Sequence, residues 1–335
     1  MNTAPFQILV VRLSSMGDVI HTLPAVASLK HSIPNSRLTW LIRPRWAPLL
    51  EGNPYVDEFI PVERSFTASL AETRRLRARH FDLAVDFQGL IQTAALAFAA
   101  KPAKLAGFDR KRVRERPAAL FYTCEIETRA EHVVERNLEL AAGSVDLAAG
   151  TSGLAAEVCR PHSLPTFPLP PGAPEGSLPA GKFILASPLA GWGAKQWPMQ
   201  RWSELAALLD LPLVVNGPAD AAPVLQQIRG ALVHLSGLPG LIDAARRARA
   251  VIGVDSGPLH LAAALAKPGV AIYGPTDPAR NGPYGGTIRV LRSPDAAVDY
   301  SRRSTPHASL LAITPPMVAA ALAAALEASS AGCRA

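Results

Sequence analysis

The stretch Gln7–Asp18, QILVVRLSSMGD, decides the fold class. Its first half, Gln7–Arg12, is a short and continuous aliphatic run, which is typical of a strand buried on both faces of a parallel sheet. The small, polar loop Leu13–Asp18 follows, and the pattern predicts a helix that begins near Asp18 and ends at Ile33. A strand, a loop and a helix in this order begin an alternating α/β pattern.

The alternation continues along the chain. Further strands are predicted at residues 38–42, 58–62, 83–87, 183–187, 213–216, 251–255 and 270–273. Helices are predicted at 67–79, 90–100, 201–210, 241–250, 258–266 and 316–328. Strands that alternate with helices imply parallel sheets covered on both faces.

A Pro- and Gly-rich stretch interrupts this pattern at residues 161–181, PHSLPTFPLPPGAPEGSLPAG. Such a composition is typical of an extended linker at a domain boundary. A chain of 335 residues is also long for a single core. We therefore expect an N-terminal domain at 1–165, a linker at 166–181, a C-terminal domain at 182–312, and a helix with a tail at 313–335.

The composition limits the class of protein. Hydrophobic residues make up 49% and charged residues 18%, which excludes a disordered chain. The net charge of +7 fits a nucleic acid, an acidic membrane surface or a phosphorylated substrate, or reflects only the Arg usage of a GC-rich genome. The three cysteines are widely spaced, so neither a disulfide framework nor a zinc site is indicated.

The N-terminus shows no secretory signal. Its first ten residues, MNTAPFQILV, lack a basic region and run directly into the first strand. The sequence contains no apolar run of the ~18–20 residues that a membrane span needs. We expect a cytoplasmic protein whose membrane contact is at most peripheral.

The loop after the first strand is the first candidate site. Open α/β sheets bind ligands beyond the carboxyl ends of their strands. Gly17 allows a tight turn, and the small side chains of Ser14 and Ser15 leave room for a ligand. Asp18 fits either a helix N-cap or a general base that faces a cleft between domains.

The second candidate is Gly191–Pro198, GWGAKQWP, after the first strand of the second domain. Its two glycines can approach phosphates closely, and Lys195 supplies a compensating charge. A surface turn with a solvated lysine is the alternative. Two tryptophans flank Lys195 in a chain with few aromatic residues, and this favours the functional interpretation.

The third candidate is Val254–His260, VDSGPLH, where a strand ends and a helix begins with Pro258 near its first turn. The free N–H groups and the dipole of such a helix start can bind a diphosphate. Asp255 fits a helix cap or a ligand contact, and His260 fits a buried structural residue or a ligand contact. The loop Gly274–Pro278 reads by itself only as a turn.

Several common motifs do not occur in the sequence. The first strand is not followed by G-x-G-x-x-G, and the chain has no P-loop and no H-E-x-x-H. It also has no Asp-x-Asp triplet, the usual carboxylate pair for a metal-bound nucleotide sugar. These absences favour a mechanism without metal.

Taken together and in order, the loops resemble the ADP-heptose:lipopolysaccharide heptosyltransferases, glycosyltransferase family nine. The segments that carry the likeness are SSMGDVIHTLPA, FDLAVDFQGLIQTAAL, EHVVERNLEL, GWGAKQWP and VDSGPLHLAAAL with YGPTDP. They extend from the first strand to the region of Tyr273. The S-S-M-G-D form looks more like the type I enzymes, which add the first heptose, than the type II enzymes.

The resemblance implies a GT-B-like fold, with two Rossmann-like, doubly wound parallel-sheet domains facing a central cleft. It implies that the N-terminal domain binds the acceptor, Kdo–lipid A, and the C-terminal domain binds the donor, ADP-L-glycero-β-D-manno-heptose. The transfer would invert the anomeric carbon without cofactor or metal, at the cytoplasmic face of the inner membrane. Nucleic acid is not an expected partner.

The resemblance also implies residue roles. Asp18 matches the general base, and Lys195 matches the lysine that contacts the donor phosphates. The donor side corresponds to Gly191, Lys195, Asp220, Asp255, Ser256, Gly257 and His260. The acceptor side corresponds to Ser14, Ser15, Gly17, Arg64, Arg114 and His132. The basic residues that could meet Kdo carboxylates, lipid A phosphates or anionic lipid are Arg64, Arg110, Lys111, Arg112, Arg114 and Arg116.

The sequence departs from the family pattern in two places. Pro188-Leu189-Ala190 stands where Thr residues often precede the lysine loop, and Asp220 stands near the position of a Glu that contacts the ribose. The alternative functions are a type II enzyme or a relative with another nucleotide sugar. From other classes, the alternatives are a nucleotide-dependent oxidoreductase and a non-catalytic binder of sugar nucleotide or anionic lipid.

Overall fold

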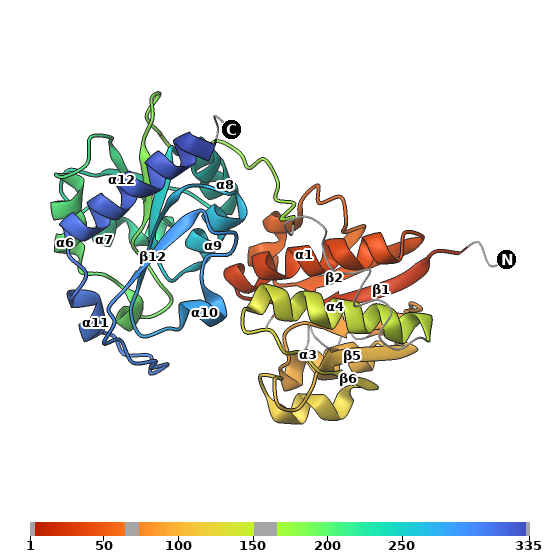
Figure 1. The fold of residues 1–335 in the computed structure, drawn as a ribbon. Helices are drawn as coiled ribbons and strands as arrows, with labels where there is room; N and C mark the ends of the chain where they lie inside the picture. The colour runs from red at the N-terminus through yellow and green to blue at the C-terminus, as the bar shows by residue number, and fades with distance from the viewer. Residues whose placement is uncertain (1–3, 64–73, 151–165, 333–335) are drawn as a thin grey trace. The chain divides into compact units, whose positions relative to one another are not determined.

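The chain forms two compact units, Met1–Pro170 (unit 1) and Pro171–Ala335 (unit 2). The computed structural model shown in Figure 1 describes residues 4–63, 74–150 and 166–332. The boundary between the units falls inside the Pro-rich segment 166–181. Within the described ranges, every helix is too short or too polar to cross a membrane.

Unit 1 is built on a parallel sheet of six strands in the order β3-β2-β1-β4-β5-β6. The strands are β1 (Phe6–Val11), β2 (Ser36–Ile42), β3 (Glu58–Pro61), β4 (Leu83–Asp86), β5 (Lys104–Phe108) and β6 (Cys124–Ile126). The helices are α1 (Met16–Ser32), η1 (Pro44–Leu50), α3 (Ile91–Ala99), η2 (Arg116–Phe121) and α4 (Val133–Ala149). Helices α1 and α4 pack side by side (Figure 1).

Unit 2 repeats this topology, with six parallel strands in the order β12-β11-β10-β7-β8-β9. The strands are β7 (Ile184–Ser187), β8 (Leu213–Gly217), β9 (Leu232–Leu235), β10 (Ala250–Val254), β11 (Gly269–Tyr273) and β12 (Ile288–Arg292). The helices are η3 (Gly193–Lys195), α6 (Met199–Ala206), η4 (Ala219–Ala221), α7 (Ala222–Leu225), α8 (Leu238–Arg247), α9 (Gly257–Ala264), α10 (Pro278–Asn281), α11 (Ala308–Leu311) and α12 (Pro315–Gly332).

Each sheet reverses its strand order at one point. In unit 1 the reversal lies between β1 and β4, and in unit 2 it lies between β7 and β10. Connections leave these two neighbouring strands in opposite directions, and open sheets of this kind bind their ligands beyond the carboxyl ends of such strands. The predicted doubly wound parallel sheets are confirmed, and the topology identifies where each unit can hold a ligand.

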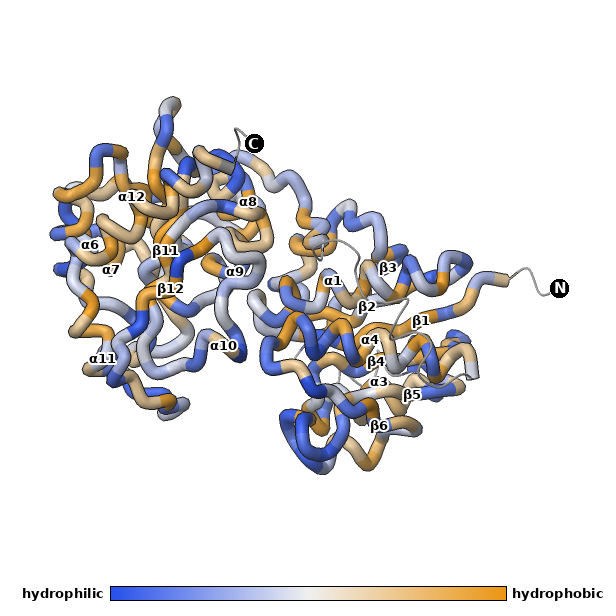
Figure 2. The backbone as a smooth tube through the Cα atoms, viewed as in Figure 1, coloured by the Kyte–Doolittle hydropathy of each residue, from blue (hydrophilic) through white to orange (hydrophobic). Residues whose placement is uncertain are grey.

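The central strands form as predicted because they are apolar on both faces. Ile8, Leu9, Val10 and Val11 of β1 are fully buried, and Val254 and Ile272 are equally buried in unit 2. The central strands of both sheets are among the hydrophobic segments of the chain (Figure 2). Burial on both faces explains why these strands read as continuous apolar runs in the sequence.

The sequence prediction missed the strands β5, β6, β9 and β12 and the helix α4. Three of these strands lie at a sheet edge, where one side of the strand is unpaired. Strand β6 has only three residues, and β12 exposes two of its five side chains. Such strands lack the apolar run that marks a buried strand. Of the predicted helix 67–79, residues 67–73 lie outside the described ranges and 74–77 are helical.

The loop that contains η3 is held by the segment before α11. The backbone N–H of Ala194 donates to Arg303 O (3.0 Å), and the N–H of His307 donates to Ala194 O (3.2 Å). A Cβ atom on Gly193 would lie 1.7 Å from the backbone oxygen of Ser304, whereas a Cβ on Gly191 would meet nothing within 4 Å. The absence of a side chain at Gly193 is therefore a requirement of packing.

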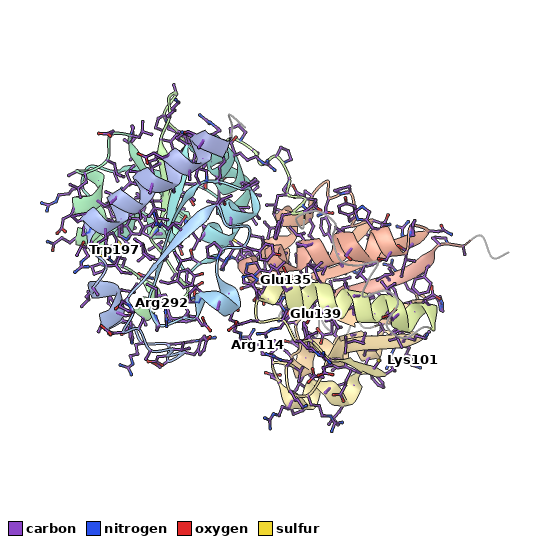
Figure 3. All side chains as sticks on the ribbon, in the orientation of Figure 1. Lys101, Arg114, Glu135, Glu139, Trp197 and Arg292 are labelled. Carbon is purple, nitrogen blue, oxygen red and sulfur yellow. The ribbon has the colours of Figure 1, made fainter. Side chains whose placement is uncertain are left out.

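The two tryptophans beside Lys195 differ in role. Trp197 is fully buried, stacks edge-on against Trp202 and donates from Nε1 to Ile313 O (3.0 Å). Figure 3 labels Trp197 within unit 2. Trp197 anchors the end of the loop in the core, while Trp192 lies beside the lysine.

These contacts predict effects of different size for two glycine substitutions in one loop. Gly193→Ala should lower the free energy of unfolding of unit 2 by about 1–3 kcal/mol, because the new Cβ forces apart two hydrogen-bonded backbone segments. Gly191→Ala should change it by less than about 0.5 kcal/mol. Urea titration followed by tryptophan fluorescence measures both, and equal losses would show that the contact with Ser304 does not constrain the loop.

Candidate functional site

Two polar clusters lie at the carboxyl ends of the strands that flank each reversal. In unit 1, Asp18 follows β1 and is joined to the loop that follows β4. In unit 2, Lys195 follows β7 and is joined to Asp255, which follows β10. The topology therefore brings each cluster to the place where a doubly wound sheet binds its ligand.

Asp18 lies in the first turn of α1 and is not its N-cap. The helix begins at Met16 with Ser15 as the N-cap, so the predicted start near Asp18 is wrong by two residues. One carboxylate oxygen of Asp18, Oδ2, accepts hydrogen bonds from the Ser15 backbone N–H (2.9 Å) and the Ser15 hydroxyl (3.0 Å). Ser15 takes the N-cap position in place of Asp18, because a serine oxygen can also satisfy free N–H groups at a helix start.

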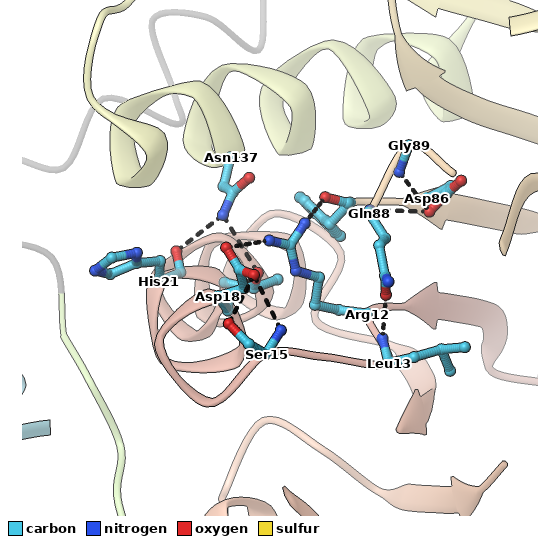
Figure 4. A network of polar contacts seen from close by, with 11 residues as sticks. Arg12, Leu13, Ser15, Asp18, His21, Asp86, Gln88, Gly89 and Asn137 are labelled. Atoms are coloured by element: carbon cyan, nitrogen blue, oxygen red, sulfur yellow. Dashed lines mark hydrogen bonds and ion pairs between the residues drawn. The ribbon is translucent and has the colours of Figure 1, made fainter. Parts of the chain in front are cut away.

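Arg12 is the partner of Asp18 that sequence reasoning did not identify. Its Nη2 lies 2.6 Å from Asp18 Oδ1, and its Nη1 donates to the backbone oxygen of Phe87, which follows β4 (Figure 4). The Arg12 side chain is buried. A buried arginine is unusual without a charged partner. The position of Arg12 at the end of an apolar strand was the sequence signal for such a pair.

The environment of Asp18 favours its ionised form. Burial by itself would raise the pKa of Asp18, but the Arg12 guanidinium and the hydrogen bonds from Ser15 outweigh burial and lower this pKa below its usual value. The charge of Arg114 acts in the same direction. Asp18 is therefore a carboxylate at neutral pH.

The loop after β4 is fixed by the buried carboxylate of Asp86. Asp86 accepts hydrogen bonds from the N–H groups of Gln88 (2.9 Å) and Gly89 (3.3 Å) and from the hydroxyls of Thr93 (3.0 Å) and Tyr122 (2.9 Å). Burial raises the pKa of Asp86 despite these bonds. The loop thus presents a rigid backbone to Arg12.

The loop after β4 is also joined to the loop after β1 and lies close to residue 114. Gln88 Oε1 accepts from the Leu13 N–H at 2.7 Å, which joins the β4 loop to the β1 loop. Gly89 has a φ of +69°, and a Cβ there would lie 3.2 Å from the backbone nitrogen of Arg114. Gly89 is therefore suited to this turn by its conformation and by the close approach of residue 114.

Four of the remaining predicted acceptor residues lie in described parts of unit 1. Ser14 is half-buried, Gly17 is buried in the first turn of α1, and Arg114 is exposed. His132 is the N-cap of α4, where its Nδ1 accepts from the Val134 N–H, and its ring lies edge-on to His21. Arg64 lies outside the described residues.

Asn137 is a second residue that sequence reasoning missed. Its side-chain amide donates to His21 O (3.0 Å) and to the Thr22 hydroxyl (3.2 Å), so it joins α4 to the first turns of α1 (Figure 4). The Thr22 hydroxyl donates in turn to the backbone oxygen of Asp18. A polar residue inside an apolar helix face was the signal in the EHVVERNLEL segment.

In unit 2, the ammonium of Lys195 lies 2.6 Å from Asp255 Oδ2, with side chains only 12% and 8% exposed. The same Nζ lies 4.2 Å from the centre of the Trp192 ring. A carboxylate and an aromatic face thus hold the ammonium. Because an ammonium has three hydrogens, the pair leaves donors for a further oxygen ligand.

Asp255 contacts Lys195 and two further side chains, one from a loop and one from helix α9. Thr276 of the Gly274–Pro278 loop donates its hydroxyl to Asp255 Oδ2 (2.7 Å), and His260 Nε2 lies 3.6 Å from Oδ1. Burial alone would raise the pKa of Asp255, but the contact with His260 and the charge of Lys195 lower it below its usual value. Burial and the Asp255 charge raise the pKa of Tyr273 well above its usual value.

The start of α9 lies beside this pair. Ser256 is the N-cap, and the helix begins at Gly257, so Asp255 is not its cap. The Ser256 hydroxyl and the Trp192 indole N–H are buried and make no hydrogen bond to any described residue. Buried donors of this kind are normally satisfied by water or ligand.

Two predicted donor residues stand apart from this pair. Gly191 is exposed in the loop before η3, and Asp220 is exposed in η4, which follows β8. Gly191 follows the carboxyl end of β7, and Asp220 follows the carboxyl end of the neighbouring strand β8.

The two clusters differ in charge. The cluster in unit 1 holds an ionised carboxylate, and the cluster in unit 2 holds a buried cation beside a helix start. Across the described residues, no three His, Cys, Asp or Glu side chains are arranged to hold a metal ion.

The ion pair in unit 1 predicts a measurable shift at Asp18. Arg12→Met should raise the pKa of Asp18, because it removes the largest of the favourable charges while burial remains. Arg12→Lys should raise the pKa of Asp18 less, since an ammonium keeps the positive charge but cannot contact Asp18 and Phe87 O with two separate nitrogens. The carboxyl ¹³C shift of Asp18 as a function of pH, assigned with Asp18→Asn, measures this, and an unchanged midpoint in Arg12→Met would contradict the assignment.

The buried pair in unit 2 predicts non-additive stability effects. Asp255→Asn should lower the free energy of unfolding by about 3–5 kcal/mol, because it leaves the Lys195 ammonium buried without a counter-charge. Lys195→Met added to Asp255→Asn should recover part of that loss. Urea titration of wild type, Asp255→Asn, Lys195→Met and the double variant measures the coupling, and strictly additive losses would argue against it. Arg247→Met, which breaks an exposed pair with Asp243, is the control and should have little effect.

The sign of the pH dependence follows from the lowered pKa of Asp255. A carboxylate whose pKa is lowered by folding contributes stability above its unfolded pKa of about 3.9 and loses it on acidification. The difference in free energy of unfolding between wild type and Asp255→Asn should therefore be largest at neutral pH. It should shrink as the pH falls below about 4.

Comparison with known proteins places the chain in a family. The profile of Glycosyltransferase family 9 (heptosyltransferase) matches residues 69–308. Lipopolysaccharide heptosyltransferase 1 of Escherichia coli strain K12 is 30% identical over 310 residues, covering 86% of this chain and 94% of that protein. Lipopolysaccharide heptosyltransferase 2 of Salmonella typhimurium is 29% identical over 351 residues, covering 93% and 96%.

The solved structure of E. coli heptosyltransferase WaaC with ADP superimposes with a TM-score of 0.74 at 27% identity, over 96% of this chain and 98% of that one. This agreement confirms the predicted GT-B-like class of fold. Since the family profile also spans most of the sequence, the chain belongs to glycosyltransferase family 9, the heptosyltransferases.

Proposed function

We propose that this enzyme transfers L-glycero-D-manno-heptose from ADP-heptose to a Kdo residue of Kdo–lipid A, with inversion at the anomeric carbon. The observation that carries the proposal is that unit 1 holds an ionised carboxylate, Asp18, at its strand reversal, while unit 2 holds a buried ammonium and a helix start at its own reversal. One group can accept a proton and the other can neutralise a diphosphate. Inverting glycosyl transfer needs both functions.

The proposal assigns the donor to unit 2. Lys195 would contact the diphosphate of ADP-heptose with the hydrogens that Asp255 does not use. The α9 N-terminus and the unpartnered Ser256 hydroxyl add donors on the same side of the pair. Gly191 gives the diphosphate close access to the loop, because its Cβ position is open. Asp220 is proposed to contact the ribose from the end of β8, and Gly257 and His260 complete the donor side.

The positive charge in unit 2 supports a metal-independent reaction. When the bond between the anomeric carbon and the ADP oxygen breaks, negative charge grows on the leaving diphosphate. A lysine ammonium and helix N–H groups stabilise such charge without reorganisation. The structures of E. coli heptosyltransferase WaaC with ADP and with ADP-2-deoxy-2-fluoro heptose support the choice of nucleotide.

The proposal assigns the acceptor to unit 1. As a Kdo hydroxyl oxygen bonds to the anomeric carbon, its proton passes to the Asp18 carboxylate. The lowered pKa of Asp18 makes it a weak base, but this suffices, because the hydroxyl becomes strongly acidic as the new bond forms. Arg114, His132 and the Ser14–Ser15 loop are proposed to position the acidic acceptor.

The acceptor choice rests on the form of the loop. The identities to type 1 and type 2 relatives are nearly equal, at 30% and 29%. The sequence Ser14-Ser15-Met16-Gly17-Asp18 is the feature that favours type I. A lipid acceptor further leads us to propose that the enzyme acts peripherally at the cytoplasmic face of the inner membrane.

The proposal predicts the outcome of one transfer assay. Wild-type protein should transfer heptose from ADP-heptose to Kdo–lipid A in EDTA, and Asp18→Asn should reduce kcat by about 10²–10⁴-fold through loss of the base. Asp82→Asn is the control, because Asp82 also has a lowered pKa but precedes β4 at the opposite end of the sheet.

Each contrary result has its own meaning. Folded wild type that fails on Kdo–lipid A but works on an acceptor already carrying one heptose would replace type I by type II. Full activity in Asp18→Asn would remove Asp18 as the base while leaving the reaction. Loss of wild-type activity in EDTA would overturn metal independence.

A further inference from the structure

An exposed apolar surface covers one side of α3 and η2 in unit 1. Leu120 of η2 is 72% exposed, Phe98 of α3 is 55% exposed, and Ile91 at the start of α3 is 42% exposed. Helices α3 and η2 pack together, and the rings of Phe98 and Phe121 meet edge-on at 5.8 Å. We call the residues Ile91, Phe98 and Leu120 the apolar patch.

The apolar patch is not the usual outer face of a helix. Ile91, Ala95 and Phe98 follow one another at helical spacing on the side of α3 that faces away from the core, while Ala94 and Ala97 are fully buried. A surface helix normally carries polar side chains on its outer face. An apolar surface of this kind marks a contact site for another molecule.

Basic side chains surround the apolar patch. At the end of α3, Arg77 Nε donates to Ala99 O (3.0 Å), and Lys101 follows the helix with an exposed side chain. At the other end, the basic segment 109–116, DRKRVRER, ends at the exposed Arg116, which begins η2. We call Arg77, Lys101 and Arg116 the basic rim. Glu115, which precedes Arg116 in the sequence, accepts the Ile91 N–H at 2.7 Å.

The figures show how this surface is arranged. The hydrophilic loop 109–116 leads into the more hydrophobic turns of η2 at the lower edge of unit 1 (Figure 2). Arg114 and Lys101 lie at opposite ends of that part of unit 1 (Figure 3). The basic charge is therefore spread along the region that contains the apolar side chains.

The apolar patch is continuous with the site in unit 1. The loop after β4 receives Arg12 at Phe87 O, turns at Gly89 and leads directly to Ile91. Gly89 O also accepts the Glu115 N–H at 2.9 Å, one residue before η2 begins. A surface that contacts the apolar patch would therefore lie next to the loop that flanks Asp18.

We propose that the apolar patch and the basic rim dock unit 1 on an anionic lipid bilayer. Apolar side chains enter the acyl boundary while lysine and arginine meet the acidic headgroups. A nucleic acid would leave Phe98 and Leu120 without an apolar partner. A symmetric contact with a second copy of this chain would bring like-charged rims together. Docking also brings a lipid-linked acceptor to the Asp18 loop, and this purpose alone rests on the proposed function.

Vesicle binding tests the docking without donor or acceptor. The full chain is sedimented with phosphatidylcholine vesicles, with and without about 30% phosphatidylglycerol, at ~0.1 M NaCl. Wild type should bind the anionic vesicles only. Phe98→Ser combined with Leu120→Ser should weaken binding by at least about tenfold, because two apolar insertions are lost. Lys101→Gln combined with Arg116→Gln should weaken it by about tenfold or more.

A matched variant controls for general loss of surface apolarity. Leu208→Ser combined with Val224→Ser removes two exposed apolar side chains from unit 2 and should bind as wild type does. Wild type that ignores anionic vesicles, or a patch variant that binds as well as wild type, would overturn the proposal. A concentration-dependent dimer in sedimentation velocity that is lost in the patch variant, without vesicle binding, would show self-association instead.

A soluble acceptor separates this proposal from the proposed function. The patch variant should transfer heptose to a delipidated Kdo acceptor at the wild-type rate, because none of its changed residues touches Asp18. If wild type fails in that assay yet binds anionic vesicles, the transfer reaction is wrong and the docking surface stands. If wild type transfers heptose but does not bind vesicles, the docking surface is wrong and the reaction stands.

Discussion

A buried ion pair at the strand reversal of each sheet is the interaction on which both candidate sites depend. Arg12 and Asp18 are joined at 2.6 Å in unit 1, and Lys195 and Asp255 are joined at 2.6 Å in unit 2. In unit 2 the pair joins the loop after β7 directly to the loop after β10. In unit 1 Arg12 also donates to Phe87 O, and this bond joins the pair to the loop after β4. Removing charges from water is costly, so such pairs persist only where hydrogen bonds complete them, as Ser15 and Thr276 do here.

The two pairs leave different groups available to a ligand. In unit 1 Arg12 is buried, while Asp18 lies in the first turn of α1 with its side chain 21% exposed. The negatively charged group of the pair is therefore the one that a ligand can reach. In unit 2 the carboxylate is enclosed by Thr276, His260 and Lys195, while the ammonium and the start of α9 remain as donors. One topology thus produces a proton acceptor in one unit and an anion site in the other. This difference, together with membership of family 9, supports heptosyl transfer over binding alone.

The central strands and the loops that follow them could be predicted from the sequence, whereas elements with a weak sequence signal could not. The strands around β1 and β10 were found because burial on both faces gives continuous apolar runs. Edge strands such as β6 and β12 were missed because half of their side chains or pairing groups face solvent. The start of α1 was misplaced because Ser15 and Asp18 are both good first-turn residues, and only backbone geometry decides between them.

The sequence by itself determined the alternating α/β pattern, the loops after the central strands and the charged residues that these loops carry. Periodicity and local turn chemistry are encoded in neighbouring residues, so they can be read along the chain. Only the tertiary structure decided the partners: Arg12 with Phe87 and Asp18, Thr276 with Asp255, and Gly193 with the backbone of Ser304. These contacts join residues far apart in the chain, and they follow from the parallel strand order, which no local pattern specifies.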